Sequence, residues 1–376
     1  MMKGKVLAAA IALVAVNLAC GGSLPAVDTG GTAIAISVAS TLTAAAPTAT
    51  AAPPTATPVP TVSPLPPRLW MSYTGGGSDA WWLSLPSASQ VTLPFNIGQF
   101  YDFAPSTSRI LYASHFASKG EGPANLAVSD LWMVDYPSGA PQAIVPTDTV
   151  VEALWSPDGQ ALGYILASPS GYELHWRTLA GEDRTLAADL APTWSISPNG
   201  DLIAFTRETG YESVGPAGLY VVPVAGGPEV QLSSVDRHGA GSIDDRPDWS
   251  LDGTHVALSY SDPANGRLGL VIAAVDGSAT SDVTFAVSVP EDIANGGMPP
   301  KVLWHPDNRH LVGLGGNYYG MGGPQDVVLF ELDPSLTTIT NGTAFGTSGI
   351  VVDWAVPGVS VWVFNDTNNV VALSLP

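Results

Sequence analysis

The chain has 376 residues, with 13 basic and 33 acidic side chains and a formal net charge of −20. Clustered lysine and arginine side chains are what bind phosphate backbones and anionic lipid surfaces, so this charge balance argues against nucleic acid and against direct binding to lipid headgroups. The single cysteine, Cys20, excludes a disulfide within one chain.

Residues 1–19 have the pattern of an export signal. Lys3 and Lys5 form a charged start, and the apolar run Val6–Val16 that follows is too short to span a bilayer as a helix. Ala19, Cys20 and Gly21 come next. The segment resembles the signal peptide of bacterial lipoproteins, in which a cysteine after a small residue receives the lipid and becomes the first residue of the mature chain. This resemblance implies export, a lipid on Cys20 and attachment to a membrane of the cell envelope.

Residues 20–67 have the composition of a linker. They are rich in Ala, Thr, Ser and Pro, they contain Asp28 as their charged residue, and they have no aromatic side chains. A segment of this kind cannot bury enough apolar surface to fold, so we expect a disordered stalk with an extended, proline-rich second half. Such a stalk would hold a folded head away from the membrane.

One short phrase recurs through residues 68–376. It reads WSPDG at 155–159, SISPNG at 195–200, WSLDG at 249–253 and WHPDN at 304–308, with fainter copies FAPSTS at 103–108 and WAVPG at 354–358. Pro, Asp or Asn, and Gly at these places favour a tight turn. A spacing near 50 residues, with an apolar strand after each turn, indicates an array of small antiparallel sheets, and such sheets close into a β-propeller.

The strand pattern within each repeat sets the number of blades. Second strands are expected after the turns at 161–166, 202–206, 255–260, 310–314 and 359–364, and third strands at 130–136, 172–179, 218–224, 268–275, 326–333 and 369–375. More polar fourth strands follow, as at 142–145 and 229–232. The stretch 68–95 lacks a first strand and the stretch 349–376 lacks a fourth. We therefore predict an all-β chain with a propeller of seven blades, incomplete at both ends; six blades, from the repeat length, is the alternative.

These repeats resemble those of TolB-like and WD40-like propellers, in which SPDG is followed by an apolar strand. The resemblance covers residues 68–376, although Leu251 replaces the proline, Ile196 replaces the tryptophan, and the copy at 103–108 lacks Asp-Gly. It implies the fold, and it implies little about function, because such propellers serve as protein-binding platforms, as sugar binders and as appendages of serine peptidases.

No catalytic motif stands out in the sequence. There is no G-x-S-x-G, and the acids Asp158, Asp252 and Asp307 are explained by their places in tight turns. No histidine pair has H-E-x-x-H spacing; His305 takes the turn position of Ser156, and His310 lies in a predicted strand. We therefore expect no catalytic residues, no metal site and no cofactor.

The long connections identify a candidate binding face. In a propeller, the turns between first and second strands lie at one end, whereas the second-to-third and fourth-to-first connections lie at the other, and binding residues gather on long loops. These loops span 114–126, 207–217, 234–246, 287–299 and 315–325. Their candidate ligand-binding residues are His115, Arg207, Tyr211, Arg237, His238, Asp244, Asp245, Tyr318 and Tyr319. Asp248 and Asp353 precede inner-strand tryptophans and are alternative candidates for the central channel.

Mixed charge with aromatic residues is typical of a recognition surface. We therefore interpret the chain as an exported, lipid-anchored propeller that binds a protein or a glycan without catalysis at the cell envelope. Two alternatives remain at this stage: a propeller enzyme acting on a glycan or lactone at the channel mouth, and a structural envelope platform with no small ligand.

Overall fold

The computed structural model describes residues 64–74, 77–94, 97–104, 106–115, 118–119, 127–168, 171–208, 216–236, 246–261, 268–286, 288–289, 302–315, 326–365 and 367–376. They belong to one compact unit, residues 60–376. The predicted signal peptide and nearly all of the predicted stalk lie outside the described residues. The regular elements of the described part are all β-strands. Within these residues there is no helix of the length and hydrophobicity needed to cross a bilayer.

The first half of the propeller contains four antiparallel blades. Blade 1 is β1 (Arg68–Thr74), β2 (Gly77–Leu83) and β3 (Ser89–Val91). Blade 2 is β4 (Gln99–Ala104), β5 (Arg109–Ala113), β7 (Ala127–Asp135) and the start of β8 (Gln142–Trp155), with β6 (Ser118–Lys119) beside β7. Blade 3 is the end of β8, β9 (Ala161–Ser168), β10 (Gly171–Thr178) and β11 (Asp183–Ala188). Blade 4 is β12 (Trp194–Ile196), β13 (Leu202–Arg207), β14 (Gly218–Pro223) and β15 (Val230–Ser233).

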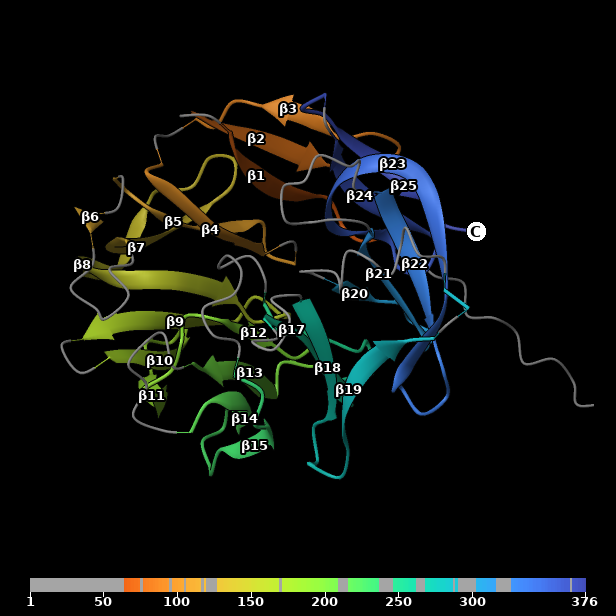
Figure 1. Ribbon diagram of the computed structural model, residues 1–376. Coiled ribbons are helices and arrows are strands. Elements are labelled where there is room, and N and C mark those ends of the chain that lie inside the picture. The colour runs from red at the N-terminus through yellow and green to blue at the C-terminus, as the bar shows by residue number, and fades with distance from the viewer. Residues whose placement is uncertain are drawn as a thin grey trace, which may run out of the picture. The chain divides into compact units, whose positions relative to one another are not determined.

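The second half adds three more blades. Blade 5 is β16 (Asp248–Trp249), β17 (His255–Ser261), β18 (Leu268–Ala274) and β19 (Thr280–Phe285). Blade 6 is β20 (Val302–Trp304), β21 (His310–Gly315), β22 (Asp326–Leu332) and the start of β23 (Thr338–Val356). Blade 7 is the end of β23, β24 (Ser360–Asn365) and β25 (Val370–Ser374). In Figure 1 the blades follow one another around a centre, from β1–β3 to β24 and β25.

Each pair of neighbouring blades shares a hydrophobic cluster. Seven clusters occur among the described residues, and the last of them joins blade 7 to blade 1 through Trp362, Trp81 and Leu83. The inner-strand tryptophans are wedges in these clusters, because Trp155, Trp194, Trp249, Trp304 and Trp354 are all buried. The core is therefore a ring of interfaces between sheets, and the prediction of seven blades is confirmed, whereas the six-blade alternative does not describe this chain.

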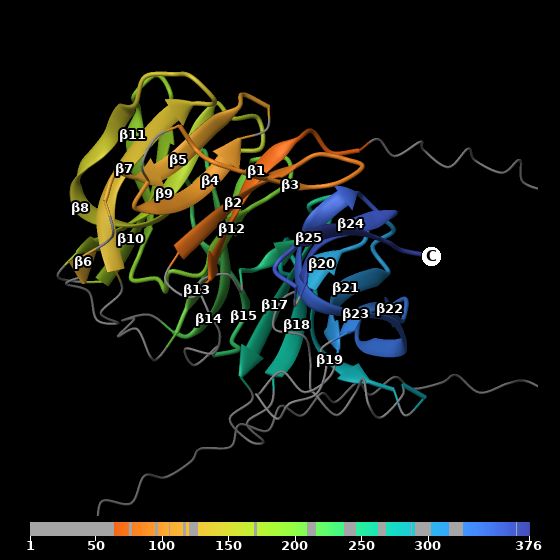
Figure 2. The ribbon, with the colours of Figure 1, turned by 90° about the horizontal axis from the view of Figure 1, so that it is seen from above.

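The ring closes by side-chain packing. Among the described strands, β1 pairs with β2 alone and β25 pairs with β24 alone, so neither terminal strand completes the other blade. Blades 1 and 7 lie side by side in both views of the ribbon (Figures 1 and 2). An ion pair of 2.5 Å joins Arg68 to Asp353, and the Leu65 N–H donates to the Ala355 carbonyl at 3.2 Å. Both terminal blades have three strands, as the repeat pattern predicts.

Two strands are longer than the sequence pattern indicates. β8 and β23 each run without a break from the outer edge of one blade into the innermost position of the next. The pattern predicted two separate strands in each case. Pairing of β8 with β9 shifts register between Val150 and Glu152, and pairing of β23 with β24 shifts between Val351 and Asp353. Such bulges bend a strand locally, and here they lie beside the point at which each strand changes its pairing partner.

The SPDG-like turns have the predicted geometry. Gly159, Gly200, Gly253 and Asn308 have φ values of 66°, 77°, 70° and 57°, and each N–H donates to the carbonyl three residues earlier. In the first of these turns the Ser156 hydroxyl donates to Asp158 at 2.6 Å and accepts the Ala161 N–H at 2.9 Å. Ser197 and Ser250 make the same contacts in their own turns. Local side-chain chemistry therefore determines each turn.

Replacing Gly159 by Ala is expected to destabilise the protein more than replacing Gly253 by Ala. Both residues have positive φ, which costs a side-chain-bearing residue on the order of 1 kcal/mol. A Cβ at Gly159 would also lie 2.9 Å from Thr107 in the turn of blade 2, whereas a Cβ at Gly253 meets nothing within 4 Å. Urea unfolding of both variants measures the difference, which we expect to be about 1 kcal/mol or more. Equal losses would show that neighbouring turns do not pack.

Candidate functional site

Strand order separates the propeller into two ends. The turn end carries the connections from first to second and from third to fourth strands, and the loop end carries the others. Of the predicted ligand-binding residues, only His115 and Arg207 are described. The rest lie outside the described residues: Tyr211, Arg237, His238, Asp244, Asp245, Tyr318 and Tyr319.

His115 lies at the loop end of blade 2, immediately after β5. Its ring is about half exposed, and its Nε2 lies 3.1 Å from the Asp148 Oδ1, also exposed, on the stretch of β8 that passes from blade 2 to blade 3. Its Nδ1 lies 3.2 Å from the Ser114 hydroxyl. We call Ser114, His115, Asp130, Trp132 and Asp148 the His115 patch.

Asp130 supports this patch from inside the blade. The buried carboxylate accepts the Ser114 hydroxyl and the Trp132 indole N–H at 2.5 Å each, and the Ser114 N–H at 2.9 Å. Burial acts to raise the pKa of Asp130, but the hydrogen bonds from Ser114 and Trp132 outweigh it and hold that pKa below its ordinary value. The patch therefore rests on an ionised, fully engaged carboxylate.

The arrangement contains the residues of a serine–histidine–aspartate triad, but its hydrogen bonds do not run from serine to histidine to aspartate. A hydroxyl has one proton, and the Ser114 proton goes to the shorter bond, toward Asp130. His115 therefore does not take that proton, and Ser114 is not activated as a nucleophile by this histidine. The exposed part of the patch is the His115–Asp148 pair, in which the Asp148 carboxylate keeps acceptor capacity beyond its contact with His115.

Arg207 has a different role from the one expected for a loop residue. It is the last residue of β13 and is buried, with its guanidinium 4.6 Å from the Tyr220 ring centroid. It donates to Glu229 at 2.8 Å and to the Ala188 carbonyl of blade 3 at 3.0 Å. Arg207 thus ties blade 4 to blade 3, and it does not contribute to an exposed binding surface.

The inner-strand acids connect neighbouring blades. Asp102 accepts the Trp155 N–H of blade 3 at 2.7 Å, and Asp248 accepts the Trp304 N–H of blade 6 at 2.8 Å. Asp353 pairs with Arg68 across the ring closure. Asp248 and Asp353, the alternative candidates for the central channel, lie on β16 and on the end of β23, and both carboxylates are engaged in holding adjacent blades together.

An ion pair also crosses the interior of the ring. Glu152, buried on β8 in blade 3, pairs with Arg246, which precedes β16 in blade 5. Because blade 4 lies between these two blades and both residues belong to innermost segments, the pair forms inside the ring. Sequence reasoning did not identify it, since the partners are 94 residues apart.

Stability should depend on pH through Asp102. Burial raises the pKa of this carboxyl to about 6, although hydrogen bonds from Trp155 and Phe103 and the charges of Arg246 and Arg68 act in the opposite direction. Because the folded pKa exceeds the unfolded value of 3.8, the native state binds the proton more tightly. The stabilisation that the protonated Asp102 carboxyl gives the folded state is therefore fully present below about pH 4, and it is lost as the pH rises through about 6.

The variant Asp102→Asn cannot ionise and keeps an oxygen to accept the Trp155 N–H. We expect its free energy of unfolding, relative to wild type, to rise between about pH 4 and pH 7 by on the order of 1–2 kcal/mol. Urea unfolding of both proteins across this range measures the change. A difference between them that is constant with pH would contradict the assignment.

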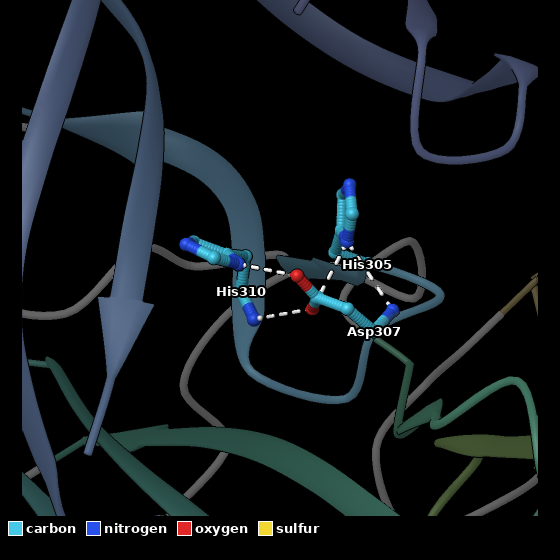
Figure 3. A group of neighbouring side chains, drawn as sticks. All are labelled: His305, Asp307 and His310. Carbon is cyan, nitrogen blue, oxygen red and sulfur yellow. Dashed lines mark hydrogen bonds and ion pairs between the residues drawn. The ribbon is translucent and has the colours of Figure 1, made fainter. Parts of the chain in front are cut away.

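The turn end of blade 6 holds a group that sequence reasoning missed. His305, Asp307 and His310 bring one nitrogen or oxygen each within 4.8 Å of one another, and they are the one such trio found among the described residues (Figure 3). We call them the turn histidine cluster. The spacing H-x-D-x-x-H across a tight turn is the signal that could have revealed it.

Seven antiparallel blades around a ring define the chain as a β-propeller. No family model and no curated protein matches the sequence. Among solved structures, oligogalacturonate lyase from Vibrio parahaemolyticus is similar at 15% identity with a TM-score of 0.51, over 82% of this chain and 86% of that one.

Two further similar structures have lower TM-scores. The β-propeller domain of the Trilobed protease from Pyrococcus furiosus has 11% identity and a TM-score of 0.47, over 78% of this chain and 83% of that one. TolB from Acinetobacter baumannii has 14% identity and a TM-score of 0.43, over 78% and 72%. At these identities the likeness concerns the fold alone. The β-propeller that the SPDG repeats predicted is the fold that the strand topology shows.

Proposed function

We propose that this protein is an exported, lipid-anchored β-propeller that binds a protein or a glycan at the cell envelope without catalysis. Binding is assigned to the loop end, and the His115 patch is its described part. The proposed anchor is the lipid on Cys20, and residues 20–67 are the proposed stalk. The remaining predicted ligand-binding residues of the loop end, other than Arg207, are retained as part of the proposal.

The observation that carries the proposal is the exposed His115–Asp148 pair on a rigid support. Both side chains are close to half exposed, whereas Asp130 beneath them is buried and fully hydrogen-bonded. Exposed polar groups whose positions are set by a packed scaffold lose little conformational entropy when a ligand binds. The Asp148 carboxylate keeps acceptor capacity beyond its contact with His115, which suits peptide N–H groups and sugar hydroxyls.

Quantitative capture from envelope extracts tests the proposal. Two forms of the mature chain, both carrying Cys20→Ser, would be immobilised. One has the wild-type loop end, and the other carries the double substitution His115→Ala/Asp148→Ala. We expect the double variant to bind the captured protein or glycan, once purified, with a Kd raised roughly tenfold or more, as is typical when central contacts are truncated.

A matched control is available at the turn end. Asp276 is exposed in the hairpin between β18 and β19, where its carboxylate accepts a hydrogen bond from the Ser278 N–H of the same turn. Asp276→Ala removes a comparable exposed carboxylate and should leave capture unchanged. Equal loss in the control, or unchanged binding by the double variant, would place recognition elsewhere. Conversion of the captured ligand into products would contradict the non-catalytic assignment.

A further inference from the structure

In the turn histidine cluster, His305 occupies the position that a serine occupies in the equivalent turns of other blades. Ser156, Ser197 and Ser250 each accept the N–H of the residue that begins or precedes the next strand, through their hydroxyls. In blade 6 the serine position is His305, and the Asp307 Oδ1 takes over this role by accepting the His310 N–H at 3.1 Å. The turn itself therefore does not require a histidine at position 305.

His305 is held in a defined orientation by the neighbouring blade. Its Nε2 lies 3.2 Å from the Gly358 carbonyl in the turn of blade 7, and its ring packs edge-on against Trp354 with 5.8 Å between the ring centroids. A carbonyl can only accept, so Nε2 carries the proton. In the neutral ring the other nitrogen, Nδ1, then carries the lone pair, toward which the Asp307 N–H is directed.

That lone pair points at another acceptor. The His305 Nδ1 lies 3.0 Å from the Asp307 Oδ1, and the Asp307 N–H approaches the same nitrogen at 3.3 Å. On the other side, the His310 Nδ1 lies 2.6 Å from the Asp307 Oδ2. Each carboxylate oxygen thus faces one imidazole nitrogen, as Figure 3 shows. A cation that replaced these direct contacts would be held by two imidazole nitrogens and one carboxylate oxygen.

The surroundings match those of metal-binding histidines. Such a histidine usually donates its far N–H to a backbone carbonyl or a carboxylate, which fixes its tautomer, and His305 does so with Gly358. Two imidazoles and one carboxylate form a donor set that suits Zn²⁺ and similar ions, whereas Ca²⁺ and Mg²⁺ prefer oxygen. All three side chains are partly exposed, between 20% and 39%, so an ion can enter and keep water as a further ligand.

We propose that His305, Asp307 and His310 form a binding site for a divalent transition-metal ion such as Zn²⁺ at the turn end of blade 6. The site is independent of the loop-end function. Because His305 also contacts Gly358, the bound ion would steady the contact between blade 6 and blade 7. Binding to the native state alone would raise the melting temperature as the metal concentration rises above the Kd.

Calorimetric titration with Zn²⁺ tests this site. The mature protein would be purified without a polyhistidine tag, freed of metal with a chelator and titrated at neutral pH. We expect one ion to bind per chain. The variants His305→Ser and His310→Ala should weaken binding roughly tenfold or more. His305→Ser introduces the residue that the equivalent turns already use, so it should fold, and the melting temperature of the metal-free protein measures what the lost contacts with Trp354 and Gly358 contribute.

The turn of blade 5 provides the matched control. His255 occupies the position equivalent to His310, and Asp252 the position equivalent to Asp307, but Ser250 stands where blade 6 has His305. His255→Ala should therefore leave Zn²⁺ binding unchanged. The proposal is overturned if the wild type takes up no Zn²⁺ at micromolar concentrations, or if folded His305→Ser binds Zn²⁺ as tightly as the wild type.

Discussion

Cys20→Ser is expected to move the protein from the membrane fraction to the soluble fraction. The physical reason is that each methylene of an acyl chain buried in the bilayer contributes about 0.8 kcal/mol, so a lipid on Cys20 dominates membrane attachment. The acidic chain, with a net charge of −20, is repelled by anionic headgroups and does not replace that contribution. Serine has nearly the shape of cysteine but lacks the thiol that accepts the lipid.

Fractionation of cells that express the wild type and the variant measures this effect, after a carbonate wash to remove loosely bound protein. The control is Ser23→Ala, which changes a hydroxyl-bearing neighbour and keeps Cys20, so it should remain in the membrane pellet. If Cys20→Ser also stays in the washed pellet, the lipid on Cys20 is not what holds the protein there.

Gly163→Ala is expected to destabilise the wild type strongly but to be tolerated better when Trp194 is replaced by Phe. A Cβ at Gly163 of β9 would lie 2.7 Å from the Cη2 and Cζ3 atoms of Trp194, which is fully buried in the cluster between blades 3 and 4. Overpacking of this kind costs about 1–3 kcal/mol. Phenylalanine lacks the outer atoms of the indole, so the added methyl group would occupy the space they leave.

Trp194→Phe alone should also destabilise the protein, by about 1–3 kcal/mol, because it leaves a cavity. It sacrifices no hydrogen bond, since the Trp194 indole nitrogen has no partner among the described residues. The double variant should therefore be more stable than the sum of the single losses predicts, by about 1 kcal/mol or more. Urea unfolding of the wild type, both single variants and the double variant gives the four free energies of this double-mutant cycle.

The control cycle combines Gly163→Ala with Trp304→Phe. Trp304 is likewise buried with an indole nitrogen that lacks a described partner, but it belongs to blade 6. These two changes should be additive within about 0.5 kcal/mol. Additivity in the Trp194 cycle as well would show that the indole does not fill the space above Gly163.

The candidate binding residues were only partly predictable from the sequence. His115 was identified because it lies in the long connection 114–126, and it does lie at the loop end, exposed beside Asp148. Arg207 was expected in the same kind of loop, yet it is buried in blade 4. Its guanidinium lies over the rings of Phe205 and Tyr220 while Glu229 balances its charge, and no local pattern shows whether such partners are within reach.

The sequence by itself determined the turns and hairpins within the blades, and the packing of blade 7 on blade 1 decided for seven blades against six. A turn such as Ser156–Gly159 depends on a hydroxyl, a proline, a carboxylate and a glycine that are consecutive in the chain, so its geometry is encoded locally. The alternation of these turns with apolar strands then specifies which strands pair, because each hairpin brings its own two strands together. The incomplete first and last blades follow from the same pattern.

Only the tertiary structure decided how groups from different blades meet. The ion pair between Glu152 and Arg246 exists because the ring closes and brings two inner segments together, and the chain between them carries no sign of it. Similarly, the proton on His305 is placed by Gly358, which belongs to the next blade. Charge pairing and tautomer choice depend on distances in space and on burial, and a one-dimensional pattern contains neither quantity.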